Sequence, residues 1–117
     1  MSQHQWDEWE VLVISAFCSD ADVSVKPSTD DFVATVAWPL PTVDRPNRRS
    51  KTIRLVITRE ALCLYLEKDE SRRKQDELKV TEWIQKQLQQ FDADHDAHKN
   101  QPPPQVDWII REEVFNS

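Results

Sequence analysis

Two groups of basic side chains are the residues of this chain whose types and spacing most plainly suit a chemical task. One group lies between residues 45 and 51 and the other at residues 72–74; the members are Arg45, Arg48, Arg49, Lys51, Arg72, Arg73 and Lys74. Arginine guanidinium groups bind phosphates and carboxylates through paired N–H donors. We therefore take these seven residues as the candidate binding site.

The charge of the chain is segregated around this site. Residues 45–74 hold ten Lys or Arg and four Asp or Glu, which gives +6, whereas the rest of the chain carries −12. Two interpretations stay open: the basic stretch is an interaction surface, or it folds against the acidic flanks. The pI of about 5.0 and the lack of an aromatic residue between Arg45 and Lys51 make nucleic acid the second choice of partner.

A second cluster, Asp92–His98, combines carboxylates with imidazoles. Its carboxylates match the first three ligand positions of a calcium-binding loop: Asp92, Asp94 and Asp96. The match ends at Ala97, where the loop needs glycine, and at Pro103, where it needs a bidentate glutamate. We predict no calcium site, and the segment is interpreted as a solvated acidic stretch in which His95 and His98 are the candidate ligands for Zn²⁺ or Ni²⁺.

Catalytic motifs are missing from the sequence. The chain has no glycine, which excludes the dinucleotide-binding and phosphate-binding glycine loops and the G-x-S-x-G nucleophile elbow. Its histidines lie near the N-terminus, at His4, or in the polar stretch after residue 92, away from a packed second shell. We therefore predict no enzymatic activity and no cofactor.

Composition predicts one soluble domain over residues 1–117, with 38% hydrophobic and 31% charged residues and five tryptophans. The longest apolar run, Val11–Cys18, is too short to span a membrane, and the acidic N-terminus is unlike a secretory signal. The expected compartment is the cytoplasm. There, Cys18 and Cys63 are expected to be reduced, buried thiols, with a disulfide as the alternative.

Hydrophobic periodicity predicts the elements that must position these residues. We expect helices over about 3–18, from Thr58 to about 67, and from Asp69 or Ser71 to about Phe91, and strands over 23–26, 32–38, 51–57 and 106–110. The alternation of Leu62, Leu64 and Leu66 would also fit a strand, but Thr58 as a helix N-cap favours a helix. Residues 92–105 are expected to form a flexible acidic and proline-rich loop.

The resulting fold class is α+β, in the order α-β-β-β-α-α-β. An antiparallel sheet of three to four strands would carry the helices on one face, and the strand over 106–110 could join it at an edge. A helical stripe is formed by Trp6, Trp9, Val13 and Phe17. We expect Trp6, Trp9 and Trp108 in the core, and the alternative is that they are partly exposed binding anchors.

Three resemblances bear on function. The order α-β-β-β-α is similar, in outline, to the double-stranded-RNA-binding domain, with Arg72-Arg73-Lys74 in place of a lysine-rich helix start. The size, acidity and element order also resemble secretion-system chaperones, which implies dimers that bind extended segments of a partner. Residues 32–39, FVATVAWP, and 53–62, IRLVITREAL, resemble a family of small uncharacterised proteobacterial proteins, which implies no activity.

These observations together predict a small cytoplasmic protein-binding adaptor, chaperone-like and without catalysis, whose partner is another protein. The charge segregation and the excess of tryptophan are the features that favour it. The alternative is a polyanion or nucleic-acid binder that uses residues 45–51 and 72–74. No membrane partner is expected, and a homodimer is compatible with either function.

Overall fold

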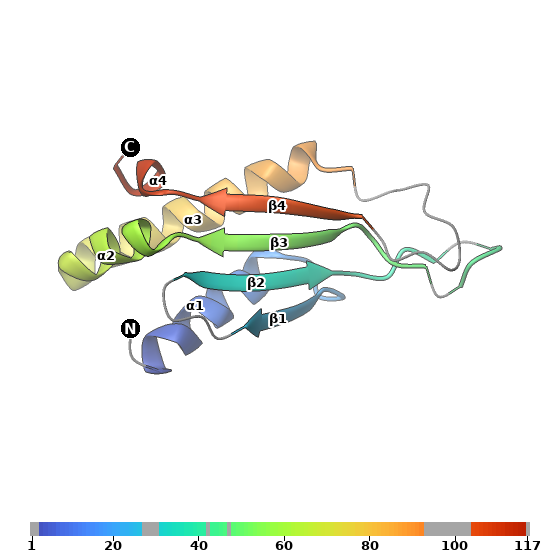
Figure 1. Cartoon of the computed structure of the whole chain (residues 1–117), viewed down its shortest axis with the longest axis horizontal. Coiled ribbons are helices and arrows are strands. Elements are labelled where there is room, and N and C mark those ends of the chain that lie inside the picture. Colours follow the sequence, from blue (N-terminus) through green and yellow to red (C-terminus); the bar gives the residue numbers. More distant parts are fainter. Residues whose placement is uncertain (1–2, 27–30, 42, 47, 93–103, 117) are drawn as a thin grey trace.

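The computed structural model describes residues 3–26, 31–41, 43–46, 48–92 and 104–116 of the 117-residue chain. Its elements, in chain order, are α1 (Gln3–Ala16), β1 (Asp22–Lys26), β2 (Phe32–Ala37), β3 (Thr52–Ile57), α2 (Arg59–Glu67), α3 (Glu70–Gln90), β4 (Gln105–Ile110) and α4 (Glu112–Asn116) (Figure 1). The predicted α+β class and element order are confirmed, and α4 follows them as an addition that the sequence pattern did not predict.

The four strands form one sheet in the order β1-β2-β3-β4. β1, β2 and β3 are an antiparallel meander, as expected, and β4 pairs with β3 in the parallel sense. The sheet is therefore mixed. The reason is the return path: α2 and α3 carry the chain back along the sheet, so β4 starts at the end where β3 starts.

One face of the sheet packs against helices and the other does not. α1 and α3 lie on the same face, as predicted, while α2 and α4 lie beyond the ends of β3 and β4 (Figure 1). The helix-facing side chains of β2 and β3 are fully buried; they are Phe32, Ala34, Val36, Ile53, Leu55 and Ile57. The opposite face carries Val33 and Val56, which are buried, and Thr35 and Arg54, which are half-buried. The two faces expected for the alternating residues of 32–38 are therefore correct.

Aromatic side chains fill the space between the sheet and the helices. Trp9 and Trp108 are buried, and the ring of Trp6 stacks on Phe32 at 5.3 Å between centroids. Trp108 also contacts the rings of Phe17 and Phe91. The interpretation as core residues is confirmed for Trp9 and Trp108, and the alternative of exposed anchors is wrong for these two. Trp6 is partly buried and packs against the core.

Side-chain caps begin the second and third helices. The Oγ1 of Thr58 accepts a hydrogen bond from the backbone N–H of Ala61 at 3.3 Å, and α2 follows directly. The strand alternative for residues 62–66 is therefore wrong. Asp69, rather than Ser71, caps α3 by accepting from the N–H of Arg72 at 2.9 Å.

A buried ion pair joins α2, α3 and α4. Asp76 is 1% exposed, and the Nζ of Lys68 lies 2.9 Å from its carboxylate. The same Nζ donates to the backbone carbonyl of Phe115 at 3.1 Å, and the ring of Phe115 is buried against Trp9 and Tyr65. This contact explains α4. Five residues are too few for the sequence pattern to predict a helix, but the hydrogen bond from Lys68 to the carbonyl of Phe115 holds them in place.

Two further expectations differ from the structure or lie outside it. Cys18 and Cys63 are unpaired, as expected for reduced thiols, but both are exposed, so their predicted burial is wrong. Cys18 follows the end of α1, and Cys63 is on the solvent side of α2. Of the loop expected over 92–105, residues 93–103 lie outside the described ranges, and Gln105 already belongs to β4. No described helix is long and apolar enough to cross a membrane.

Removing the carboxylate of Asp76 should destabilise the fold strongly, because Lys68 would lose its buried partner. We expect Asp76→Ala to lower the free energy of unfolding by about 3 kcal/mol, measured by urea denaturation. The matched control is Glu82→Ala, an exposed acid of the same helix, with an expected change within about 0.5 kcal/mol. Similar losses for the two variants would contradict the role assigned to this ion pair.

Candidate functional site

The structure does not bring the two basic groups together. The chain between β2 and β3 continues as a hairpin beyond the sheet, in which Leu40 donates its N–H to the carbonyl of Arg48 at 2.9 Å. This hairpin projects from one end of the molecule (Figure 1). Residues 72–74 lie in the first turn of α3, beside α2 at the opposite end. The seven predicted residues therefore form two separate surfaces rather than one.

Several of these basic side chains have partners within the chain. Arg49 forms an ion pair with Asp22, and Lys51 lies over the ring of Phe91 at 6.0 Å. Arg73 donates to the carbonyl of Leu66 at 2.7 Å and lies over the ring of Tyr65. These three contacts favour the interpretation in which basic residues fold against the rest of the chain.

The other four predicted basic residues differ in their exposure to solvent. Arg45 and Arg48 are half-buried in the hairpin, whereas Arg72 and Lys74 are exposed on α3. The candidate metal ligands His95 and His98 lie outside the described residues. Within the part of the chain that is described, no group of three His, Cys, Asp or Glu side chains could hold a metal ion.

β4 gives the sheet an edge with outward-facing backbone groups. The carbonyls of Pro104 and Ile110 accept hydrogen bonds from the N–H groups of Thr52 and Thr58, so the even-numbered residues of β4 face β3. Successive residues of a strand point to opposite sides, and Gln105, Asp107 and Ile109 therefore direct their N–H and C=O groups away from the sheet. We call this outer side of Gln105–Ile110 the β4 edge.

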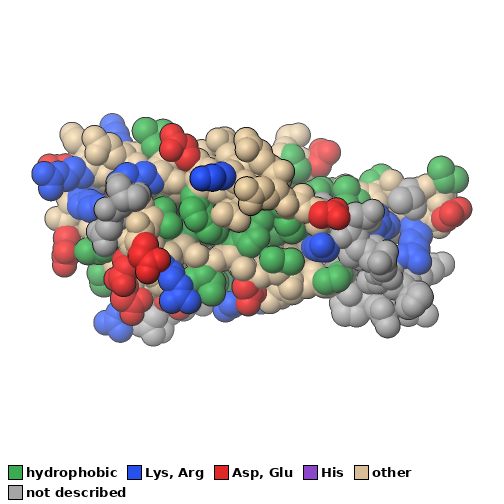
Figure 2. All heavy atoms as spheres, turned by 90° about the horizontal axis from the view of Figure 1, so that it is seen from above, with side chains coloured by type: hydrophobic (Ala, Val, Ile, Leu, Met, Phe, Trp, Pro, Cys, Tyr) green, Lys and Arg blue, Asp and Glu red, His purple; other side chains and the backbone are tan. Residues whose placement is uncertain are grey.

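Apolar side chains flank the β4 edge on both faces of the sheet. Ile109 is 40% exposed on the open face, and Val106 is half-buried on the helix-facing side. Figure 2 shows the molecule from this side, with hydrophobic side chains gathered along its middle. A hollow of about 420 Å³ lies between α3 and α4. It is lined by Trp83 and Val114 and by charged residues of both helices. Trp83 also contacts the ring of Trp108 in β4, which places the hollow beside this edge.

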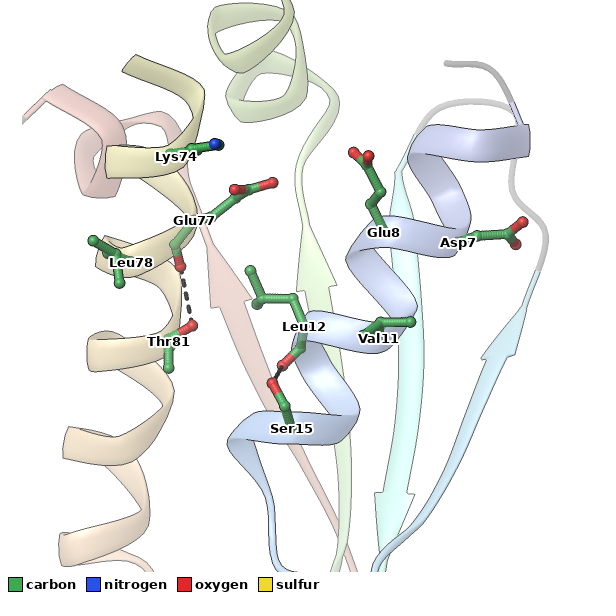
Figure 3. A pocket seen from close by; sticks show the side chains of 9 residues that line it. All are labelled: Asp7, Glu8, Val11, Leu12, Ser15, Lys74, Glu77, Leu78 and Thr81. Carbon is green, nitrogen blue, oxygen red and sulfur yellow. Dashed lines mark hydrogen bonds between the residues drawn. The ribbon is translucent and has the colours of Figure 1, made fainter. Parts of the chain in front are cut away.

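The second surface is a groove between α1 and α3 on the outer side of the helix layer. Its volume is about 810 Å³, and its lining residues are Asp7, Glu8, Val11, Leu12, Ser15, Lys74, Glu77, Leu78 and Thr81 (Figure 3). We call it the helix groove. The two helices run in the same direction, so the charged residues gather toward one end and the hydroxyls of Ser15 and Thr81 lie toward the other.

The charged end of the helix groove has a buried tyrosine behind it. The hydroxyl of Tyr65 donates to the carboxylate of Glu77 at 3.0 Å. Burial raises the pKa of Tyr65 above its ordinary value of 10, and the negative charges of Glu77 and Glu8 raise it further, while Arg73 acts in the opposite direction. Tyr65 therefore stays neutral and serves as a hydrogen-bond donor that fixes Glu77.

Sequence reasoning missed both surfaces. The signal for the helix groove was Leu78, an apolar residue outside the buried stripe of α3 that contains Val80 and Ile84. A large apolar residue on the polar side of a helix indicates a contact beyond the helix itself. The sequence did predict the strand over residues 106–110 at an edge of the sheet, and this is confirmed. Its pairing with β3, which decides which backbone groups face outward, depends on the path of the whole chain.

Comparisons with known proteins leave these surfaces as the evidence on function: no family model, no curated protein and no solved structure matches this chain. The resemblance to small proteobacterial proteins stays a prediction.

The neutral state of Tyr65 gives a pH dependence that can be measured. Tyr65 is the one tyrosine of the chain, so the ultraviolet absorbance of tyrosinate reports on it alone. In urea we expect ionisation near pH 10, and in the native protein ionisation should begin only at higher pH. Because the unfolded state releases this proton first, its contribution to stability is complete below about pH 10 and is lost as the pH rises further. Identical titrations in urea and buffer would contradict the assignment.

Proposed function

We propose that this chain is a chaperone-like adaptor that binds an extended segment of another protein by adding it to the sheet at the β4 edge. The observation that carries the proposal is the row of outward N–H and C=O groups at Gln105, Asp107 and Ile109. In strand addition, such main-chain groups supply affinity and the neighbouring side chains supply specificity.

The contrast between the two edges of the sheet supports the choice of β4. β1 has charged residues at both ends, Asp22 and Lys26, and Asp22 is paired with Arg49 across the sheet. Charged side chains on an edge strand hinder pairing with another chain. β4 is one residue longer and has Asp107 as its one charged residue, so it is the less protected edge.

The side chains around the β4 edge indicate what the bound segment would contain. A strand added here directs alternate residues to the two faces of the sheet. On the open face these residues would lie beside Ile109, and on the other face beside Val106 and the hollow that contains Trp83. The matching segment has apolar residues on both sides, with charges where it meets Lys79 and Glu82 at the rim.

The alternative function, polyanion binding, has less support. It relied on residues 45–51 and 72–74 acting together, and these lie at opposite ends of the molecule. Each group alone offers few exposed cations, since Arg49, Lys51 and Arg73 contact other parts of the chain.

A proline on the β4 edge should weaken binding without removing a hydrogen bond of the sheet. The N–H of Asp107 faces outward, so Asp107→Pro removes a donor that strand addition needs and β3 does not use. In a display library of random peptides, we expect wild-type protein to enrich segments with alternating apolar residues. Asp107→Pro should bind them about tenfold more weakly, the equivalent of one or two lost hydrogen bonds.

The matched control is Asp107→Ala, which changes the same side chain and keeps the N–H. Its affinity for the enriched peptides should remain within about threefold of the wild type, because main-chain bonds dominate strand addition. Circular dichroism would establish that both variants keep the fold. Equal binding by the proline and alanine variants, or no enrichment of extended segments by the wild type, would contradict the proposed function.

A further inference from the structure

The outer side of the helix layer exposes an unusual amount of apolar surface. Val11 is 66% exposed, Ile14 47% and Leu78 62%, and these are three of the five large hydrophobic side chains that are exposed among the described residues. Val11 and Leu78 line the helix groove from opposite walls (Figure 3). A contiguous apolar surface of this kind marks an interface rather than a solvated face.

The charges around this surface differ between the two helices, since Lys and Arg occur on α3 alone. The described side chains of α1 include three acids, Asp7, Glu8 and Glu10, and no Lys or Arg. The first turns of α3 expose Arg72 and Lys74 next to Glu70, while Arg73 turns inward onto Leu66. Glu77 of α3 also lines the groove, where its carboxylate accepts a hydrogen bond from the hydroxyl of Tyr65. Since α1 and α3 run in the same direction, the acidic group and the basic group lie at the same end of the layer.

The spacing of charged and apolar residues is the same on both helices. Asp7 precedes Val11 by four residues, and Lys74 precedes Leu78 by four residues. Four residues correspond to about 6 Å along a helix, so each helix presents a charge and an apolar side chain one turn apart. The two patterns are complementary in charge and equal in length.

We infer that the helix groove is the interface of a symmetric homodimer, in which α1 of each chain packs against α3 of the other. A two-fold axis parallel to the helices places α1 opposite the partner's α3 and keeps their ends in line. Asp7 then faces a lysine and Val11 faces a leucine, and symmetry forms each contact twice. An axis perpendicular to the helices would oppose the charged end to the hydroxyl end, which offers no matching charge.

This inference goes beyond the proposed function, because the interface lies on the helix layer and leaves the β4 edge exposed. A dimer of this kind presents two β4 edges. Pairing between two β4 edges is the competing form of dimer, and substitutions in the helix groove would leave it unchanged.

The test is a charge exchange followed by sedimentation or by size-exclusion chromatography with light scattering. The wild type should approach twice the chain mass of 13.8 kDa across micromolar to submillimolar concentrations. Lys74→Glu and Asp7→Lys should each weaken the dimer about tenfold, since each places like charges opposite one another twice. The double variant should recover the wild-type dissociation constant within about threefold. If Asp7 and Lys74 do not face each other across the interface, the double variant will not recover the wild-type dissociation constant.

Controls separate this interface from general effects of charge. Leu78→Glu should abolish the dimer, whereas Val43→Glu makes the same kind of change at a fully exposed position of the hairpin and should have no effect. Lys86→Glu repeats the charge reversal on the other side of α3, in the hollow beside the β4 edge, and should also have no effect. A wild type that stays monomeric, or a dimer insensitive to Leu78→Glu, would overturn the inference, and neither result would bear on peptide binding at the β4 edge.

Discussion

The contact of Trp9 with Tyr65 and Phe115 is the interaction on which the rest of this structure depends. The rings of Trp9 and Tyr65 lie 4.9 Å apart, and both contact Phe115 at 6.5 Å. The three residues come from α1, α2 and α4, so one aromatic cluster joins the beginning, the middle and the end of the chain. Aromatic side chains bury large apolar areas, and their mutual packing adds to that gain.

The positions of both candidate surfaces follow from this cluster. It fixes α4 at the end of β4, and the ion pair of Lys68 with Asp76 reinforces the same corner. β4 is thereby placed at the edge of the sheet beside β3. The cluster also fixes α1 beside the start of α3, and this proximity creates the helix groove with Glu77 held by Tyr65. The side chains that stabilise the fold are thus the ones that position the surfaces.

The sequence predicted the elements whose signals are local. The cap at Thr58 defined α2, the stripe from Trp6 to Phe17 defined α1, and the alternation in residues 32–38 gave the correct faces of β2. The parallel pairing of β4 and the existence of α4 were not predictable, because each depends on contacts with residues distant in sequence. The burial of Cys63 was predicted wrongly for a related reason: the apolar neighbours of a residue in sequence do not show which side of a helix faces the core.

The candidate site shows the same division. By its composition and periodicity, the sequence determined an α+β fold with a tryptophan-rich core and no glycine-dependent motif, because these properties depend on residue type and short-range spacing. The tertiary structure decided that the two basic groups lie at opposite ends, that β4 pairs with β3 in the parallel sense, and that Asp7 and Lys74 share one end of a groove. Such properties are set by the path of the chain through space, since residues that are 67 positions apart in sequence become neighbours only when α1 and α3 pack side by side.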